Sequence, residues 1–70
     1  MERFGEKLKA LRKQHNLSQM AIGKILEVDY SYIGKMERGE NIPNATMLLK
    51  IAGYFQVSLD QLMWDHLELD

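Results

Sequence analysis

Residues 17–39, LSQMAIGKILEVDYSYIGKMERG, decide the fold because they predict two short helices joined by a tight turn. Ser18 is a suitable N-cap for the first of these helices, and Asp29 is a suitable N-cap for the second. Gly39 stands where a chain commonly leaves a helix with positive φ. The apolar residues of the first helix recur with the spacing of one helical face: Ile22, Ile25 and Leu26. The pattern therefore predicts a helix-turn-helix over about residues 18–38.

The second helix of this unit separates into an apolar face and a polar face on a helical wheel. Ile33 and Met36 fall together and are predicted to face the core, while Tyr30 flanks the opposite side. The outward stripe is made of small and cationic residues: Ser31, Gly34, Lys35 and Arg38. A short helix of this kind suits insertion into the major groove of DNA. The alternative reading is an ordinary amphipathic surface helix.

Three motifs together carry a resemblance to a known family: LSQ at residues 17–19, SYIGKMERG at 31–39 with Pro43 following, and VSLDQL at 57–62. In these motifs the chain resembles the lambda-repressor-like (Cro-type, xenobiotic-response-element type) helix-turn-helix DNA-binding family. The resemblance extends from about Phe4 to Met63. It implies an all-α fold, a compact domain of five helices, and double-stranded DNA as the partner.

The segments around this unit also read as helices. Glu2 to His15 is apolar on one face, and its basic residues other than Arg12 are expected to be solvated: Arg3, Lys7, Lys9 and Lys13. Asn44 is the predicted N-cap of a fourth, strongly apolar helix, and Ser58 is the predicted N-cap of a helix over about residues 59–68. With 70 residues, the chain is expected to form a single domain over 1–70.

Composition excludes several classes of protein. The chain has no cysteine, so disulfides and thiolate metal sites are excluded. It contains no apolar run long enough to span a membrane and begins without a signal peptide, so a cytoplasmic location is expected. The net charge is −1, yet residues 1–50 hold nine basic and six acidic side chains, whereas residues 51–70 hold four acidic and none basic. A DNA-binding face at the basic end remains feasible.

The resemblance implies a role for particular residues. The base edges of DNA would be contacted by Tyr30, Ser31 and Lys35. The DNA backbone would be contacted by Gln19, Lys24, Arg38, Asn41 and Asn44. For Asn44, capping alone and capping together with a phosphate contact are both open. Arg12 and Glu37 would form an ion pair that clamps the first helix to the third; two exposed charges of little energetic weight are the alternative.

Three features depart from the family pattern. Glu27 stands where the family usually places glycine, at a turn that needs a left-handed residue, which should cost about 1 kcal/mol relative to glycine. Gly23 stands where the family has a small alanine for close helix packing. Three positions that are usually polar are apolar in this chain: Met20, Ala21 and Ile25. These side chains either extend the core or form an exposed patch for a second, unidentified protein partner. Apolar residues scattered on a surface are common, so a partner is not needed to explain them.

The C-terminal helix has more apolar residues than one buried stripe requires. We expect a homodimer interface there, formed by Leu59, Met63, Trp64 and Leu67. Acidic residues would surround it and turn this pole away from DNA: Asp60, Asp65, Glu68 and Asp70. The alternative is that Trp64 simply packs on the first helix. A homodimer would read a pseudo-palindromic operator with half-sites about 34 Å apart.

No catalytic constellation is visible, and no metal or cofactor is predicted. His15 and His66 lie on separate predicted helices without an obvious metal, serine or carboxylate partner. The sequence therefore predicts a DNA-binding transcriptional regulator, most often a repressor in proteins of this kind. The alternative is a protein-interaction module that keeps the fold but has lost strong DNA binding. The operator, and the choice among phage repressor, antitoxin and restriction controller, are not decided by the sequence.

Overall fold

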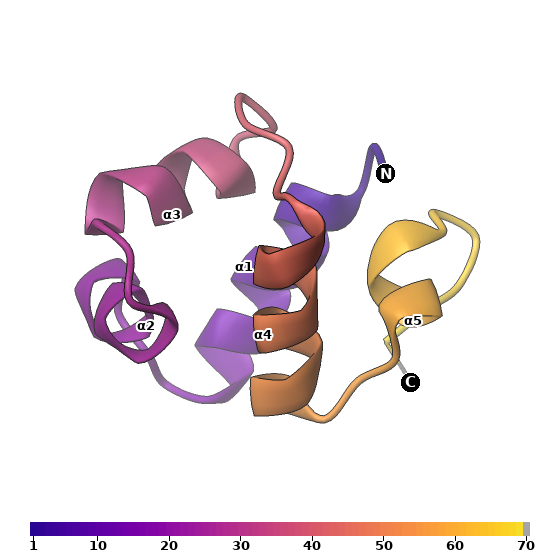
Figure 1. The fold of residues 1–70 in the computed structure, drawn as a ribbon. Coiled ribbons are helices and arrows are strands. Elements are labelled where there is room, and N and C mark those ends of the chain that lie inside the picture. The colour runs from indigo at the N-terminus through magenta and orange to yellow at the C-terminus, as the bar shows by residue number, and fades with distance from the viewer. Residues whose placement is uncertain (70) are drawn as a thin grey trace.

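The computed structural model describes residues 1–69 and contains five helices in that range: α1 (Phe4–Gln14), α2 (Gln19–Leu26), α3 (Tyr30–Glu37), α4 (Ala45–Phe55) and α5 (Leu59–Met63). The predicted all-α fold is confirmed. In Figure 1, α2 and α3 lie on one side of the molecule and α5 on the other, with α1 and α4 between them. This arrangement separates the helix-turn-helix from the C-terminal helix.

The core takes one completely buried aliphatic side chain from each helix. These residues have no solvent-exposed surface: Leu8, Ile22, Ile33, Ile51 and Leu62. Burying a side chain of this size contributes about 1.5–3 kcal/mol. A small domain with one residue per helix at its centre loses part of its core whenever a single helix detaches. The helix-turn-helix is therefore held in place by contacts that reach the far end of the chain.

Side-chain caps begin the last four helices at the residues expected from the sequence. Ser18 Oγ accepts a hydrogen bond from the Ala21 amide at 3.0 Å, and Asn44 Oδ1 accepts one from the Met47 amide at 2.8 Å. Asp29 caps α3 in the same way. At α5, Ser58 forms a reciprocal capping box, in which its amide also donates to the side chain three residues later. Local chemistry thus explains where these helices start.

The turn between α2 and α3 has the left-handed geometry expected at Glu27, whose φ is 63° and ψ is 42°. Its carboxylate lies 3.5 Å from the ammonium of Lys50 on α4, so the negative charge at the turn has a partner. Gly23 lets the turn pack tightly, because a Cβ on it would lie 2.9 Å from the Val28 carbonyl oxygen. An alanine at this position would therefore require the backbone of the turn to shift.

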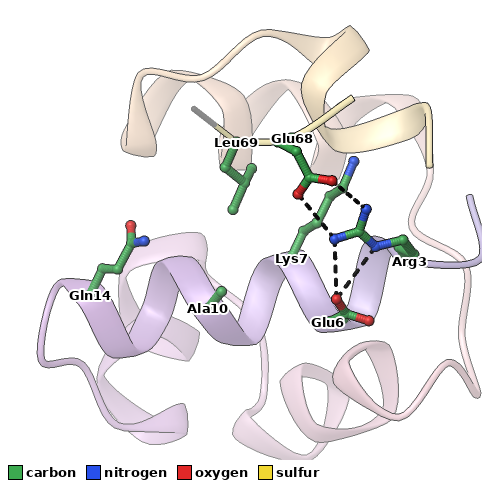
Figure 2. A pocket seen from close by; sticks show the side chains of 7 residues that line it. All are labelled: Arg3, Glu6, Lys7, Ala10, Gln14, Glu68 and Leu69. Carbon is green, nitrogen blue, oxygen red and sulfur yellow. Dashed lines mark hydrogen bonds and ion pairs between the residues drawn. The ribbon is translucent and has the colours of Figure 1, made fainter. Parts of the chain in front are cut away.

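The C-terminal helix is shorter than predicted. The expected helix over 59–68 ends at Met63, because Trp64 adopts an extended conformation with φ −89° and ψ 120°. Residues 64–69 instead fold back beside α1, as Figure 2 shows for Glu68 and Leu69. The predicted contribution of Asp70 lies outside the described residues. One carbonyl group of α5, that of Gln61, accepts a hydrogen bond from a donor on another helix.

That donor is Lys7, which was expected to be solvated and is instead 2% exposed. Its ammonium donates to the carbonyl oxygens of Gln61 at 2.6 Å, Trp64 at 2.7 Å and Leu67 at 2.6 Å. Three N–H donors meet three acceptors, so the buried charge is fully hydrogen-bonded. Helical spacing in the sequence could not reveal these acceptors, because they are backbone groups of a segment about 54–60 residues later.

Arg3 and Asp65 connect the two ends of the chain. The Asp65 carboxylate accepts hydrogen bonds from the backbone amides of Glu2 at 3.1 Å and Arg3 at 2.8 Å, and so caps the start of α1. These bonds, chiefly the one from Arg3, hold the pKa of Asp65 below its ordinary value. The Arg3 guanidinium lies between Glu6 and Glu68, as Figure 2 shows. Asp65 and Glu68, expected to surround a dimer interface, are therefore bound to the N-terminal segment.

Replacing Lys7 with methionine tests this connection. Lys7→Met should lower the free energy of unfolding by about 2 kcal/mol, because buried carbonyl groups lose their donor. For a domain of this size the melting temperature Tm should fall by about 8–16 °C. Lys9→Met, on the exposed face of the same helix, is the matched control and should change stability by less than about 0.5 kcal/mol. Equal Tm values for the two variants would contradict the role given to Lys7.

Candidate nucleic-acid interface

The outer face of α3 carries the residues expected to contact bases. Ile33 and Met36 are completely buried and fix the rotation of the helix about its axis. Tyr30, Ser31 and Lys35 are exposed, and we call these three residues the reading face. An eight-residue helix with this division can offer its exposed side chains to a groove while its inner side chains stay packed.

Gly34 does not belong to the exposed stripe predicted from the helical wheel, because it is buried. A Cβ built on it would lie 3.0 Å from a terminal guanidinium nitrogen of Arg38 and 3.6 Å from the amide group of Gln19. The side chains of Gln19 and Arg38 therefore cover this position. The beginning of α2 approaches α3 here at ordinary van der Waals distance, and a wheel of α3 alone cannot show this.

Gln19, Arg12 and Glu37 form one hydrogen-bonded network at that approach. Arg12 Nε donates to Glu37 Oε2 at 2.6 Å, and a terminal nitrogen of Arg12 donates to Glu37 Oε1 at 3.1 Å. Gln19 Nε2 donates to the same Glu37 oxygen at 3.2 Å, and Arg12 also donates to the Leu17 carbonyl oxygen at 3.0 Å. The expected pair is thus present, and it joins α1, the entry to α2, and the end of α3.

This pair is protected from water. The side chains of Arg12 and Glu37 are 12% and 4% exposed, so it differs from the weak surface pair considered as the alternative. The hydrogen bond from Arg12 to Glu37 raises the pKa of the guanidinium. Gly5 allows the close approach of α1, because a Cβ on it would lie 2.5 Å from the carbonyl oxygens of Met36 and Glu37. The orientation of α3 is therefore set from α1.

The residues expected to contact the DNA backbone come from α2, from the end of α3 and from the loop that follows it. Lys24 is exposed in the last turn of α2, and Asn41 is exposed in the loop after α3. The amides of Glu40 and Asn41 both donate to the Lys35 carbonyl oxygen, at 2.8 and 3.4 Å, which folds this loop against the end of α3. Asn44 uses its side-chain oxygen to cap α4. The structure brings Gln19 and Arg38 together over Gly34.

Arg38 has an internal partner that the sequence analysis missed. Its Nε donates to Glu40 Oε2 at 2.7 Å, and this bond raises the pKa of Arg38 and lowers the pKa of Glu40. Both side chains are more than half exposed, so the pair is open to exchange with another anion. In the sequence, this pair is indicated by the opposite charges of Arg38 and Glu40, which flank Gly39. A phosphate approaching Arg38 would have to compete with this carboxylate.

The unusual apolar residues of α2 lie on the surface rather than in the core. Met20 is 57% exposed and Ile25 is 38% exposed, whereas Ala21 is partly buried. Of the two readings left open, extension of the core is therefore wrong for Met20 and Ile25.

None of the helices within residues 1–69 is long and apolar enough to cross a membrane. The same residues contain no group of His, Asp and Glu placed to hold a metal ion.

The fold and this surface define a small helix-turn-helix domain of the lambda-repressor-like type. Residues 8–62 match the family described as Helix-turn-helix, and the chain belongs to that family. The chain is 38% identical over 60 residues to the HTH-type transcriptional activator BcrR of Enterococcus faecalis, spanning 86% of this chain and 29% of that protein. It is 31% identical over 61 residues to the uncharacterized HTH-type transcriptional regulator YazB of Bacillus subtilis (strain 168), spanning 87% of this chain and 88% of that protein.

Among solved structures, the chain is similar to the P22 c2 repressor protein in complex with a synthetic operator. The two are 36% identical with a TM-score of 0.82, and the match covers 87% of this chain and 92% of that chain. The chain therefore spans nearly all of some relatives but less than a third of BcrR. These comparisons establish the family and the fold.

The Arg12–Glu37 pair provides a stability test of the interface. Arg12→Met should lower the free energy of unfolding by about 3 kcal/mol, because it leaves a charged carboxylate buried without its partner. The double variant Arg12→Met with Glu37→Met should cost clearly less than the sum of the two single changes. Urea unfolding of the four proteins measures the coupling. Additive costs would show that the two side chains do not interact.

Proposed function

We propose that this protein binds double-stranded DNA as a transcriptional regulator, with α3 in the major groove. The observation that carries the proposal is the reading face, which projects from a helix whose opposite side is completely buried. Membership of the helix-turn-helix family supports it, as does the similarity to a repressor whose solved structure contains an operator. A rigid helix with exposed polar side chains is the usual means of reading base edges.

In this proposal the exposed residues divide into two groups. The reading face contacts base edges, and Lys35 suits the acceptors of guanine. The DNA backbone is contacted by Gln19, Lys24, Arg38, Asn41 and Asn44. Asn44 can serve both purposes considered for it, since its oxygen caps α4 and its amide nitrogen remains able to donate to a phosphate. Such contacts position the helix, and their strength falls as the salt concentration rises.

We further propose that the protein binds a pseudo-palindromic operator as a homodimer, most simply as a repressor. The two half-sites would lie about 34 Å apart along DNA. Trp64 is 55% exposed and Leu59 is 36% exposed. Leu59 begins α5 and Trp64 directly follows it, and α5 lies on the opposite side of the molecule from α3 (Figure 1). Met63 and Leu67 are partly buried, so Leu59 and Trp64 are the main residues of the proposed interface.

A DNA mobility shift with duplexes selected from a random pool tests the first proposal. Lys35→Ala should weaken binding to the selected operator by about 1–3 kcal/mol and relax the base preference at one position in each half-site. Lys24→Ala should weaken binding to all sequences alike. Its binding constant should also fall less steeply with salt concentration, by the equivalent of about one phosphate contact. If wild-type protein shifts no duplex even at low salt, the interaction-module alternative replaces this proposal.

Sedimentation tests the dimer. Wild-type protein at micromolar concentration should sediment as a dimer, and Leu59→Ala with Trp64→Ala should give a monomer with unchanged helical circular dichroism. The same variant should lose cooperative operator binding, since a single domain makes too small an interface for tight specific binding. Ile42→Ala, which removes a side chain 79% exposed in the loop before α4, is the control and should remain dimeric. A monomeric wild type, with and without DNA, would overturn this interface.

A further inference from the structure

The first turn of α3 contains a hydrogen-bonded pair that goes beyond helix capping. One carboxylate oxygen of Asp29, Oδ1, accepts from the backbone amide of Ser31 at 2.8 Å and from the hydroxyl of Ser31 at 2.8 Å. The first contact is the ordinary cap of a helix. The second orients the hydroxyl of a residue on the reading face.

The direction of the second bond follows from the chemistry of the two groups. Two hydrogen bonds hold the pKa of Asp29 below its ordinary value. The larger effect comes from the backbone amide of Ser31 and the smaller one from its hydroxyl. The ionised carboxylate can only accept, so the shared proton belongs to Ser31. A hydroxyl has one hydrogen and two lone pairs, and here the hydrogen is already used. What Ser31 can offer to a further partner is an acceptor.

We propose that Ser31 determines specificity as a hydrogen-bond acceptor, selecting a base that presents an amino group in the major groove. This inference rests on the proposed DNA-binding function. The amino groups available there are N6 of adenine and N4 of cytosine, whereas guanine and thymine present acceptors at the equivalent position. Two acceptors facing each other repel, so Ser31 disfavours guanine and thymine on the strand that it contacts. Asp29 is the positioning residue, and its negative charge adds to that preference.

Lys35 adds a hydrogen-bond donor to the reading face, one helical turn after the acceptor at Ser31. It lies four residues after Ser31, which places both side chains on the same side of α3. Its ammonium only donates, so it suits base acceptors such as O6 and N7 of guanine. The reading face therefore offers an acceptor in its first turn and a donor one turn later. A half-site is expected to contain an amino-bearing base and an acceptor-bearing base in that order along the groove.

Base analogues in the selected operator test the inference directly. The base pair that Ser31 reads is first located as the position at which Ser31→Ala loses discrimination. Replacing adenine there with purine, or cytosine with 2-pyrimidinone, deletes only the amino group and should weaken wild-type binding about 3- to 10-fold. Replacing N7 of the purine at that pair with carbon should leave wild-type binding unchanged. Neither replacement should change the affinity of the Ser31→Ala variant for the operator.

Two variants serve as controls. At the pair read by Lys35, the effects should be reversed: the N7 replacement weakens wild-type binding and has no effect on Lys35→Ala. Asp29→Gly retains most of the capping preference and frees the Ser31 hydroxyl to donate. It should therefore recover affinity for an operator in which the Ser31-dependent pair is reversed, which wild-type protein disfavours.

The outcomes separate this inference from the proposed function. If wild-type protein binds its operator but the Ser31-dependent pair responds to N7 replacement and not to loss of the amino group, Ser31 is a donor and the inference is wrong. The inference is equally wrong if Ser31→Ala keeps wild-type discrimination at every pair. In both cases DNA binding itself stands. Absence of binding to any duplex overturns the proposed function, and the inference with it.

Discussion

The contact between Arg12 and Glu37 is the interaction on which the arrangement of α1, α2 and α3 depends. The two side chains meet through two hydrogen bonds, and Glu37 also receives one from Gln19. Breaking a buried charged pair is expensive because the remaining charge loses both water and its partner. The end of α3, the beginning of α2 and the last turn of α1 are therefore held together by one carboxylate. The orientation of the reading face follows from this contact and from the buried side chains of Ile33 and Met36.

A second set of polar contacts closes the chain at its opposite side. Lys7 satisfies three carbonyl groups beyond and within the last turn of α5, while Asp65 caps the start of α1. A five-residue helix has little stability of its own, since few of its hydrogen bonds lie within the helix. The hydrogen bonds that Lys7 of α1 donates to carbonyl groups in and after α5 stabilise this short helix. Helix α1 therefore supports both the helix-turn-helix and the C-terminal segment.

The acidic side chains near the reading face fit this arrangement because most of them have partners. Glu27 lies beside Lys50, Glu40 is bonded to Arg38, and Asp29 accepts two hydrogen bonds from Ser31. Glu27 and Glu40 are thus paired with cations on a surface that also exposes Lys24 and Lys35. The pair of Arg38 and Glu40 is exposed and therefore open to a competing anion, whereas the pair of Arg12 and Glu37 is largely shielded from water.

The sequence by itself determined the local features of this protein. Ser18, Asp29, Asn44 and Ser58 indicated the helix starts because capping acts over two or three residues, and apolar spacing identified Ile22 and Ile33 as core. The Arg12–Glu37 pair came from a family resemblance, and the structure contains it. Only the tertiary structure decided the burial of Lys7, the covering of Gly34 and the end of α5 at Met63. The reason is that each depends on atoms of another helix or a distant segment, and periodicity along one helix carries no information about those atoms.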